Sequence, residues 1–190
     1  MDVVRHRFTA EEYRKMGEAG IFSEDDRVEL IDGEVVEMTP IGWRHALCVT
    51  RLTTLLAGSA NEQAMLGRHY GVSVQNPIAL RRHEEPQPDL ALVEGSPSGR
   101  LPGPAEVALV VEVADTSLAH DRERKLPLYA EVGIPEAWLV DLNAETIEVY
   151  SEPGPTGYGR VVRFEREGRV FSDTLPNLTF DAAEALASEE

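Results

Sequence analysis

The sequence predicts an α/β fold whose core has the order helix, three strands, helix, strand. Its 190 residues are 42% hydrophobic and 27% charged, which is typical of a soluble globular domain. Apolar residues recur at helical spacing in residues 43–57, and short β-branched segments follow in residues 70–114 between Pro and Gly clusters. A second amphipathic segment, residues 121–132, precedes an apolar strand. We therefore expect a single domain over residues 1–190, with its core at about residues 28–150.

Two local signals define the N-terminal elements. Thr9 and Glu12 have the spacing of a capping box, which predicts a short helix directly after Thr9. The dipeptide Asp32-Gly33 stands between apolar and β-branched residues, and it favours the positive-φ turn of a two-residue hairpin. A hairpin is therefore expected over residues 28–38.

The first core helix and the three strands follow in order. Val49, Leu52 and Leu56 recur on one helical face, and Gly58 is expected to end that helix. The strands that come next are expected over residues 70–80, 88–93 and 107–114.

The second core helix has an unusual start. Pro127 has no N–H and breaks a helix interior, so the helix is expected to begin near Arg124, with Lys125 in its first turn. The last core strand is expected over residues 137–140.

The remaining chain is expected to form a C-terminal antiparallel extension, about residues 151–190, in which Asp181 caps a short helix. The free edge of such an extension needs a cover, so we expect a homodimer or a higher homo-oligomer.

The charge balance limits the function classes. Lys and Arg number 18 against 34 Asp and Glu, which gives a net charge of -16 and a pI of about 4.7. Nonspecific nucleic-acid binding depends on basic surface, so a nucleic-acid function here needs a local basic site or a bridging metal. The arginines expected to gather at the rim of such a site are Arg44, Arg51, Arg81, Arg82, Arg122 and Arg124.

Several other classes lack their signatures. The single cysteine, Cys48, excludes an internal disulfide and a Cys-rich zinc site, and the five histidines show no paired ligand spacing. There is no phosphate-binding loop, dinucleotide fingerprint or serine-hydrolase elbow. No signal peptide or membrane span is recognised, so we expect a cytoplasmic protein without a membrane partner.

Two acidic residues lie in segments that are expected to form apolar strands. Glu112 lies within the apolar run VALVVEVA, where a buried carboxylate must be paired, protonated or bound to a metal. Asp89 begins the run DLALV behind Pro86 and Pro88. If the two strands are neighbours, both acids can converge on one hard divalent cation. The alternatives are an Arg-paired structural Glu112 and an Asp89 that caps the Pro-rich turn.

Lys125 supplies a cation one loop after the Glu112 strand. A divalent metal beside an ammonium suggests phosphoryl chemistry, since both stabilise the charge that develops on a phosphodiester. The alternative for Lys125 is an exposed salt bridge to Asp121.

The succession of segments also resembles a known family. The segments RVELIDGEVVEM, PDLALV, LVVEVADTS, DRERKLPLYAEVGIPEAWLVD and TIEVY, with His45 in the first core helix, resemble the Uma family of restriction endonucleases, a branch of the PD-(D/E)XK phosphodiesterases. The resemblance covers about residues 8–150. It implies a restriction-endonuclease-like α-β-β-β-α-β core with a mixed central sheet.

The resemblance also implies roles for individual residues. Asp89 and Glu112 would be the metal-binding acids, with Val113 also in the metal site, and Lys125 the catalytic lysine. The cofactor would be Mg²⁺, with Mn²⁺ as a substitute. Glu29 would be an additional acid near the site. Considered as a strand residue, Glu29 is equally compatible with a solvent-facing polar position.

The sequence departs from the superfamily at one position. The tripeptide Glu112-Val113-Ala114 has Ala where the E-x-K signature has Lys. The Uma family resembles those branches in which the lysine has moved to the next helix, and Lys125 is the candidate for it.

Two further residues are weaker candidates. His45 falls in register with the buried helix face, where a lone His is more often a hydrogen-bonded core residue. Gln75 could position substrate or water, or could have only a surface role.

The sequence therefore predicts a metal-dependent phosphodiesterase, most plausibly a DNA endonuclease. A binding or assembly module that keeps the fold without activity is the competing hypothesis, motivated by the net charge and Ala114. A hydrolase of small phosphodiesters is a third.

Overall fold

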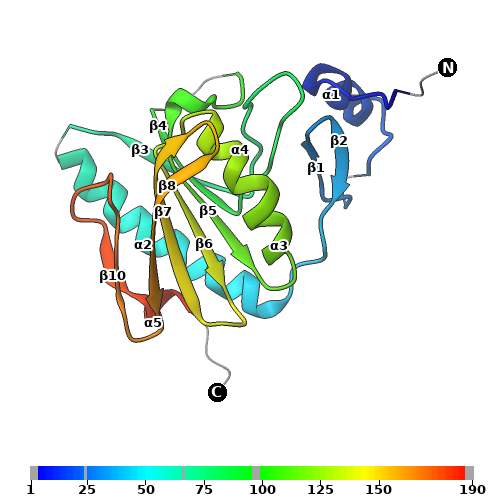
Figure 1. Cartoon of the computed structure of the whole chain (residues 1–190). Coiled ribbons are helices and arrows are strands. Elements are labelled where there is room, and N and C mark those ends of the chain that lie inside the picture. Colours follow the sequence, from blue (N-terminus) through cyan, green and yellow to red (C-terminus); the bar gives the residue numbers. More distant parts are fainter. Residues whose placement is uncertain (1–3, 24, 66, 96–98, 187–190) are drawn as a thin grey trace.

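A six-stranded mixed sheet forms the centre of the protein (Figure 1). The computed structural model describes residues 4–23, 25–65, 67–95 and 99–186. The sheet order is β3-β4-β5-β6-β7-β8, in which β5 and β6 are parallel and every other neighbouring pair is antiparallel. The strands are β3 (Tyr70–Val74), β4 (Leu90–Glu94), β5 (Val107–Ala114), β6 (Glu136–Asp141), β7 (Thr146–Gly154) and β8 (Gly157–Glu165). The predicted α/β fold with a mixed central sheet is confirmed.

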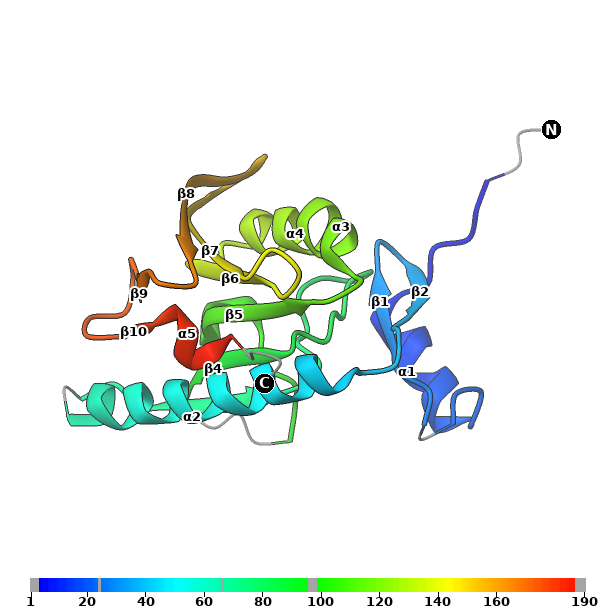
Figure 2. The same ribbon diagram turned by 90° about the horizontal axis from the view of Figure 1, so that it is seen from below.

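Helices cover both faces of the sheet (Figure 2). The long helix α2 (Trp43–Met65) covers one face. The other face carries a continuous helical run of α3 (Leu118–His120), a wide π-helical turn (Asp121–Lys125) and α4 (Leu126–Glu131). A short 3₁₀ helix, Pro104–Glu106, leads into β5.

Strand β5 divides the core into two halves because its side chains alternate between the faces. Leu109, Val111 and Val113 belong to the cluster that packs against α2. Val110 and Ala114 belong to the cluster on the α4 side. Glu112 shares its face with Val110 and Ala114, so its side chain meets the helical run after β5.

The N-terminal arm consists of α1 (Ala10–Glu18) and the hairpin of β1 (Val28–Ile31) and β2 (Glu34–Glu37). The predicted capping box starts α1, and Asp32 and Gly33 adopt the positive φ angles of 55° and 74° that the hairpin turn requires. Both predictions are confirmed. The arm lies beside one end of the sheet (Figure 1), where Leu30 forms a bridge with Glu85.

Two predicted boundaries are wrong. Helix α2 continues past Gly58 to Met65. An interior Gly costs a helix only about 1 kcal/mol, and the continued turns bury Ala60 and Gln63. Strand β3 ends at Val74 instead of residue 80, since Gln75 has a φ of 50° and turns the chain out of the strand.

The helical run after β5 begins six residues before the predicted start near Arg124. It runs from Leu118, so Lys125 lies in its interior and the first-turn position predicted for it is wrong. Pro127 is accommodated because the main-chain hydrogen bonds before it have changed to the wider π-helical spacing. In this spacing the Leu126 N–H bonds to the Asp121 carbonyl.

The C-terminal part is antiparallel as predicted, but it is divided between two sheets. Strands β7 and β8 extend the central sheet, whereas β9 (Arg169–Phe171) and β10 (Thr179–Asp181) pair separately. Asp181 caps α5 (Ala182–Ala185), which contacts α2. A single domain over residues 1–190 stays a prediction. In the described ranges, no helix has the length and apolar character needed to cross a membrane.

Candidate active site

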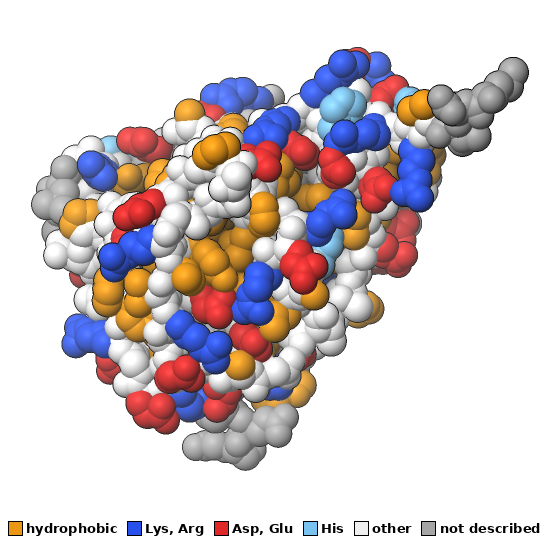
Figure 3. Space-filling view, viewed as in Figure 1, with side chains coloured by type: hydrophobic (Ala, Val, Ile, Leu, Met, Phe, Trp, Pro, Cys, Tyr) orange, Lys and Arg blue, Asp and Glu red, His pale blue; other side chains and the backbone are white. Residues whose placement is uncertain are grey.

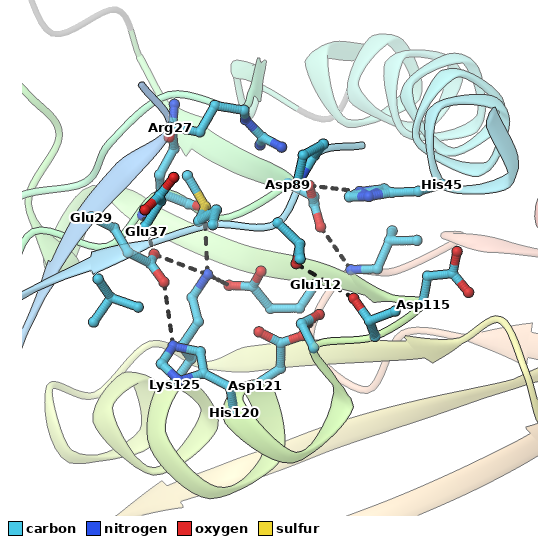
Figure 4. Close-up of a pocket in the computed structure, with 18 of the residues that line it drawn as sticks. Arg27, Glu29, Glu37, His45, Asp89, Glu112, Asp115, His120, Asp121 and Lys125 are labelled. Atoms are coloured by element: carbon cyan, nitrogen blue, oxygen red, sulfur yellow. Dashed lines mark hydrogen bonds and ion pairs between the residues drawn. The ribbon is translucent and has the colours of Figure 1, made fainter. Parts of the chain in front are cut away.

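A cavity of about 450 Å³ lies between the N-terminal arm, the start of α2 and the helical run after β5 (Figure 4). Its floor is the place where β4 begins and β5 ends, and residues from all of these elements line it. Asp89, Glu112, Val113, Lys125, Glu29 and His45 are among the lining residues. Six of the seven residues that the sequence singles out are thus brought to one cavity.

Asp89 and Glu112 face each other across neighbouring strands. Leu90 pairs with Val111 in the antiparallel β4–β5 ladder, and this register, continued by one residue, sets Asp89 opposite Glu112. Side chains at opposite positions lie about 5 Å apart at Cβ. Asp89 is 8% exposed and Glu112 is 2% exposed. The predicted adjacency of the two acidic strands is confirmed.

Three hydrogen bonds orient Asp89. His45 Nε2 lies 2.9 Å from Oδ1, and Gln75 Nε2 donates to the same oxygen at 3.2 Å. The Val113 N–H donates to Oδ2 at 2.9 Å. Asp89 is therefore tied to α2, to the turn after β3 and to β5, and its side chain does not cap the Pro-rich turn. Gln75 itself is not a lining residue, but it contacts two residues that are: it donates to Asp89, and its carbonyl accepts a hydrogen bond from Gln87 Nε2.

Lys125 is buried between two carboxylates. Its Nζ lies 2.8 Å from Glu112 Oε1 and 3.2 Å from Glu29 Oε2, and it donates to the Gln87 carbonyl at 3.4 Å. The exposed salt bridge to Asp121, considered as the alternative, is not formed; Asp121 accepts a hydrogen bond from Ser117 Oγ at 2.6 Å. A lysine from the helix after β5 thus reaches the acid of the E-x-K position.

Glu29 is not a solvent-facing strand residue, since only 2% of it is exposed. Besides Lys125, it contacts the Gln87 N–H at 3.0 Å and His120 Nε2 at 3.4 Å (Figure 4). The arm therefore inserts a carboxylate into the site.

Burial and pairing shift the pKa values of this cluster. Burial raises the pKa of Glu112 well above its usual value, and Lys125 opposes that shift. Burial also acts to raise the pKa of Glu29, but Lys125, His120 and the Gln87 N–H outweigh it and lower the value to about 2. Burial alone would lower the pKa of Lys125, whereas Glu112 and Glu29 raise it. Glu29 and Lys125 are thus held in their charged forms, whereas burial disfavours the charged form of Glu112.

The donor set fits a magnesium-type cation. Mg²⁺ is usually held by one or two protein carboxylates, with water and substrate phosphate completing the shell. Asp89 and Glu112 supply two carboxylates, and both contacts made by Glu112, to Lys125 and Tyr129, fall on Oε1, which leaves Oε2 for a cation. Among the described residues, no group of three or more His, Cys, Asp or Glu side chains is arranged to hold a metal ion.

Val113 can take part only through its main chain, because its side chain is packed in the core against α2. A strand residue presents its N–H and C=O to the same side, and the Val113 N–H points to Asp89. Its carbonyl oxygen is therefore on the same side as that acid.

Three residues of the site were missed in the sequence. Tyr129 is fully buried and donates to Glu112 Oε1 at 2.5 Å. His120, the last residue of α3, lies 3.4 Å from Glu29, and no sequence pattern indicated this contact. Arg27 lines the cavity, and its spacing of two residues from Glu29, on one face of an extended chain, is a signal that could have identified it.

Of the six arginines predicted at the rim, Arg44 lies next to the cavity, since its Nη1 is 3.9 Å from Oδ1 of the lining residue Asp115. None of the six lines the cavity. Most of them contact other parts of the described protein. Arg44 and Arg51 donate to the carbonyls of Leu142 and Leu186, respectively. Ion pairs join Arg81 to Glu131, Arg122 to Glu148 and Arg124 to Asp32.

Comparison with known protein families identifies the family of this chain. The family model described as "Uma2: Putative restriction endonuclease" matches residues 10–183. The chain belongs to the Uma2 family. The resemblance inferred from the sequence is confirmed.

A solved structure has the same fold as this Uma2 family member. It is described as a "putative nuclease belonging to DUF820 from Anabaena variabilis ATCC 29413". The TM-score is 0.73 at 13% sequence identity, over 94% of this chain and 97% of the other. None of the curated proteins matches the chain significantly.

Proposed function

We propose that this protein is a metal-dependent phosphodiesterase, and specifically a DNA endonuclease that uses Mg²⁺, with Mn²⁺ as a substitute. One observation carries the proposal. Two acids, Asp89 just before β4 and Glu112 in β5, stand at opposite positions of the continued β4–β5 register in a cavity where the Lys125 ammonium lies 2.8 Å from Glu112. Membership of a family described as a restriction endonuclease supports it.

Asp89, Glu112 and the Val113 carbonyl are the proposed ligands. A bound divalent cation polarises the phosphodiester and lowers the pKa of water, which supplies the nucleophile at neutral pH. His45 and Gln75 hold Asp89 in place through hydrogen bonds to Oδ1. Tyr129 and Lys125 do the same for Glu112, both at Oε1.

Lys125 takes the place of the lysine that the E-x-K pattern lacks. Ala114 is fully buried on the α4 side of β5, so a longer side chain there would have to displace the core. Lys125 brings an ammonium to the same face from the helical run. Its fixed positive charge stabilises negative charge that develops on the phosphate in the transition state.

The test is cleavage of supercoiled DNA and of single-stranded DNA with Mg²⁺ or Mn²⁺. Wild-type protein should cleave, and Asp89→Asn or Glu112→Gln should reduce the rate by on the order of a hundredfold or more. Glu94→Gln is the matched control, because Glu94 is an exposed acid at the other end of β4 and does not line the cavity. It should cleave like wild type.

Two results would overturn this proposal. Folded wild-type protein that cleaves no DNA with either metal, but retains nucleic-acid binding, would favour the binding module. Hydrolysis of a small phosphodiester such as bis(p-nitrophenyl) phosphate without DNA cleavage would favour the small-molecule hydrolase.

We also propose that the protein forms a homodimer. Strand β8 is an edge of the central sheet and exposes 55% of Val161. A long edge strand is a surface on which a second copy can pair. Light scattering should give twice the monomer mass, and a monomer at high concentration would contradict the proposal.

A further inference from the structure

The cavity wall is strongly acidic. Its acidic lining residues are Glu29, Glu37, Asp89, Glu112, Asp115 and Asp121. Apart from two histidines, the basic lining residues are Arg27 and Lys125. A phosphodiester carries a negative charge, so the wall repels it unless a cation faces the substrate.

Lys125 has no N–H left for a phosphate. An ammonium group has three donors. Glu112 Oε1, Glu29 Oε2 and the Gln87 carbonyl lie at 2.8, 3.2 and 3.4 Å from Nζ, and the Lys125 side chain is only 3% exposed. Its charge acts on the site through space, but a direct bond to the substrate would require one of these contacts to break.

The donors of Arg27, unlike those of Lys125, are not taken up by ion pairs within the described ranges. Arg27 stands just before β1 in the N-terminal arm and lines the cavity. Figure 4 shows the side chain reaching over the cavity toward the side on which Asp89 lies. A guanidinium is always charged and presents a planar fork of donors that matches two phosphate oxygens.

The face of the molecule shown in Figure 3 offers little to a long duplex. A protein that follows duplex DNA neutralises many phosphates with Lys and Arg. On the face shown in Figure 3, basic side chains are scattered among acidic ones and form no stripe. Most of the arginines expected at a groove are bonded to the protein itself, as described above. A cavity of about 450 Å³ is in the size range of small-ligand pockets and suits a nucleotide that is not held in a duplex.

We propose that Arg27 is the phosphate-binding residue of this site and that its substrate is a single-stranded nucleic acid, held through about one phosphate. The proposal rests on the nuclease function proposed above and specifies its substrate class. The arm carries the substrate contact, whereas the sheet and the helical run carry the proposed catalytic groups.

The test is equilibrium binding of a short labelled single strand and of the matching duplex, measured by fluorescence anisotropy across a salt series. Ca²⁺ replaces Mg²⁺ to fill an oxygen-ligand site while cleavage is minimised. The single strand should bind more tightly than the duplex. Its log Kd should change with log salt with a slope of about 0.7, the value for one phosphate on a single strand.

Arg27→Ala should weaken single-strand binding by on the order of tenfold and remove most of this salt dependence. Arg27→Lys should recover part of the affinity, since it keeps the charge but not the fork. Arg5→Ala is the matched control. Arg5 also belongs to the N-terminal segment and faces Glu34 at 3.6 Å, but its side chain is 91% exposed and does not line the cavity. It should bind like wild type.

The outcomes separate this proposal from the proposed function. Equal binding by wild type and Arg27→Ala would overturn the role of Arg27. Tighter binding of the duplex, with a salt slope several times larger, would overturn the single-strand assignment while leaving a nuclease. Wild-type protein that neither binds nor cleaves either nucleic acid would overturn the proposed function and this inference together.

Discussion

The two acids of the cavity are held in different ways. On the α4 side, Glu112 is buried with Glu29 around the Lys125 ammonium, so three ionisable groups share one water-poor cluster. Asp89, which stands opposite Glu112 just before β4, is held by His45, Gln75 and a main-chain N–H, without Lys or Arg. The first arrangement makes charge balance a condition of folding. The second positions a carboxylate at little electrostatic cost.

This difference changes what can be expected of Lys125. A lysine in the first turn of an exposed helix could be removed with little effect on folding. The observed lysine is 2% exposed and separates two carboxylates, so its removal leaves uncompensated buried charge.

The largest expected effect is therefore on stability. Lys125→Ala should lower the free energy of unfolding by about 3–5 kcal/mol, the usual cost of breaking a buried pair from one side. Urea denaturation at neutral pH measures it. Adding Glu29→Gln to Lys125→Ala should restore part of the loss, because one of the stranded charges is removed. A loss below about 1 kcal/mol would show that the cluster is not charge-coupled.

The second-largest expected effect is a pH dependence of the unfolding free energy that is caused by Glu29. Its pKa is lowered to about 2 from an ordinary 4.5, so it stabilises the folded protein fully above pH 4.5, and this contribution is lost as the pH falls through 2. The shift corresponds to about 3 kcal/mol. The difference in unfolding free energy between wild type and Glu29→Gln, measured at several pH values, should shrink by about this amount between pH 5 and 2. A constant difference would contradict the assignment.

A smaller effect is expected at Tyr129, which joins Glu112 from α4. Tyr129→Phe removes the hydroxyl that donates to Glu112 Oε1 at 2.5 Å and leaves the ring in the core. A hydrogen bond to an ionised or ionisable carboxyl contributes about 1.5–3 kcal/mol. Thermal and urea unfolding should show a loss in this range. Tyr150→Phe, which removes a hydroxyl that donates to the more peripheral Glu148, is the control and should cost less.

The smallest stability effect is expected on the α2 side. His45→Ala removes one of three hydrogen bonds to Asp89 and should cost about 1 kcal/mol. Its effect on cleavage should be larger than its effect on stability, since Asp89 loses its orientation. Cleavage rates and unfolding curves of the same preparation check this. A His45→Ala protein with wild-type cleavage would remove His45 from the site.

Much of the candidate site could be predicted because it is encoded in strand alternation. An acid inside an apolar strand identified Glu112, and an acid at the start of the neighbouring strand identified Asp89. Lys125, on the helical run that follows β5, was the third predicted site residue. These signals are local, and the pairing of consecutive strands brings them together.

The remaining features depend on tertiary structure that local patterns do not encode. The wide turn at Asp121–Lys125 shifts the helical register, and with it the position of Lys125. The arm lies beside one end of the sheet and brings Glu29 and Arg27 to the cavity. Helix α2 passes through Gly58 because buried contacts on both sides outweigh one weak residue.

The central claim is that Asp89 and Glu112 together hold a divalent cation, and calorimetric titration of the apo protein with Mg²⁺ and then Mn²⁺ tests it most directly. Wild type and Glu94→Gln should bind one ion per chain at the cavity. Asp89→Asn and Glu112→Gln should each abolish that binding while the protein remains folded by circular dichroism. Undiminished binding in both variants, or no binding by wild type, would contradict the account.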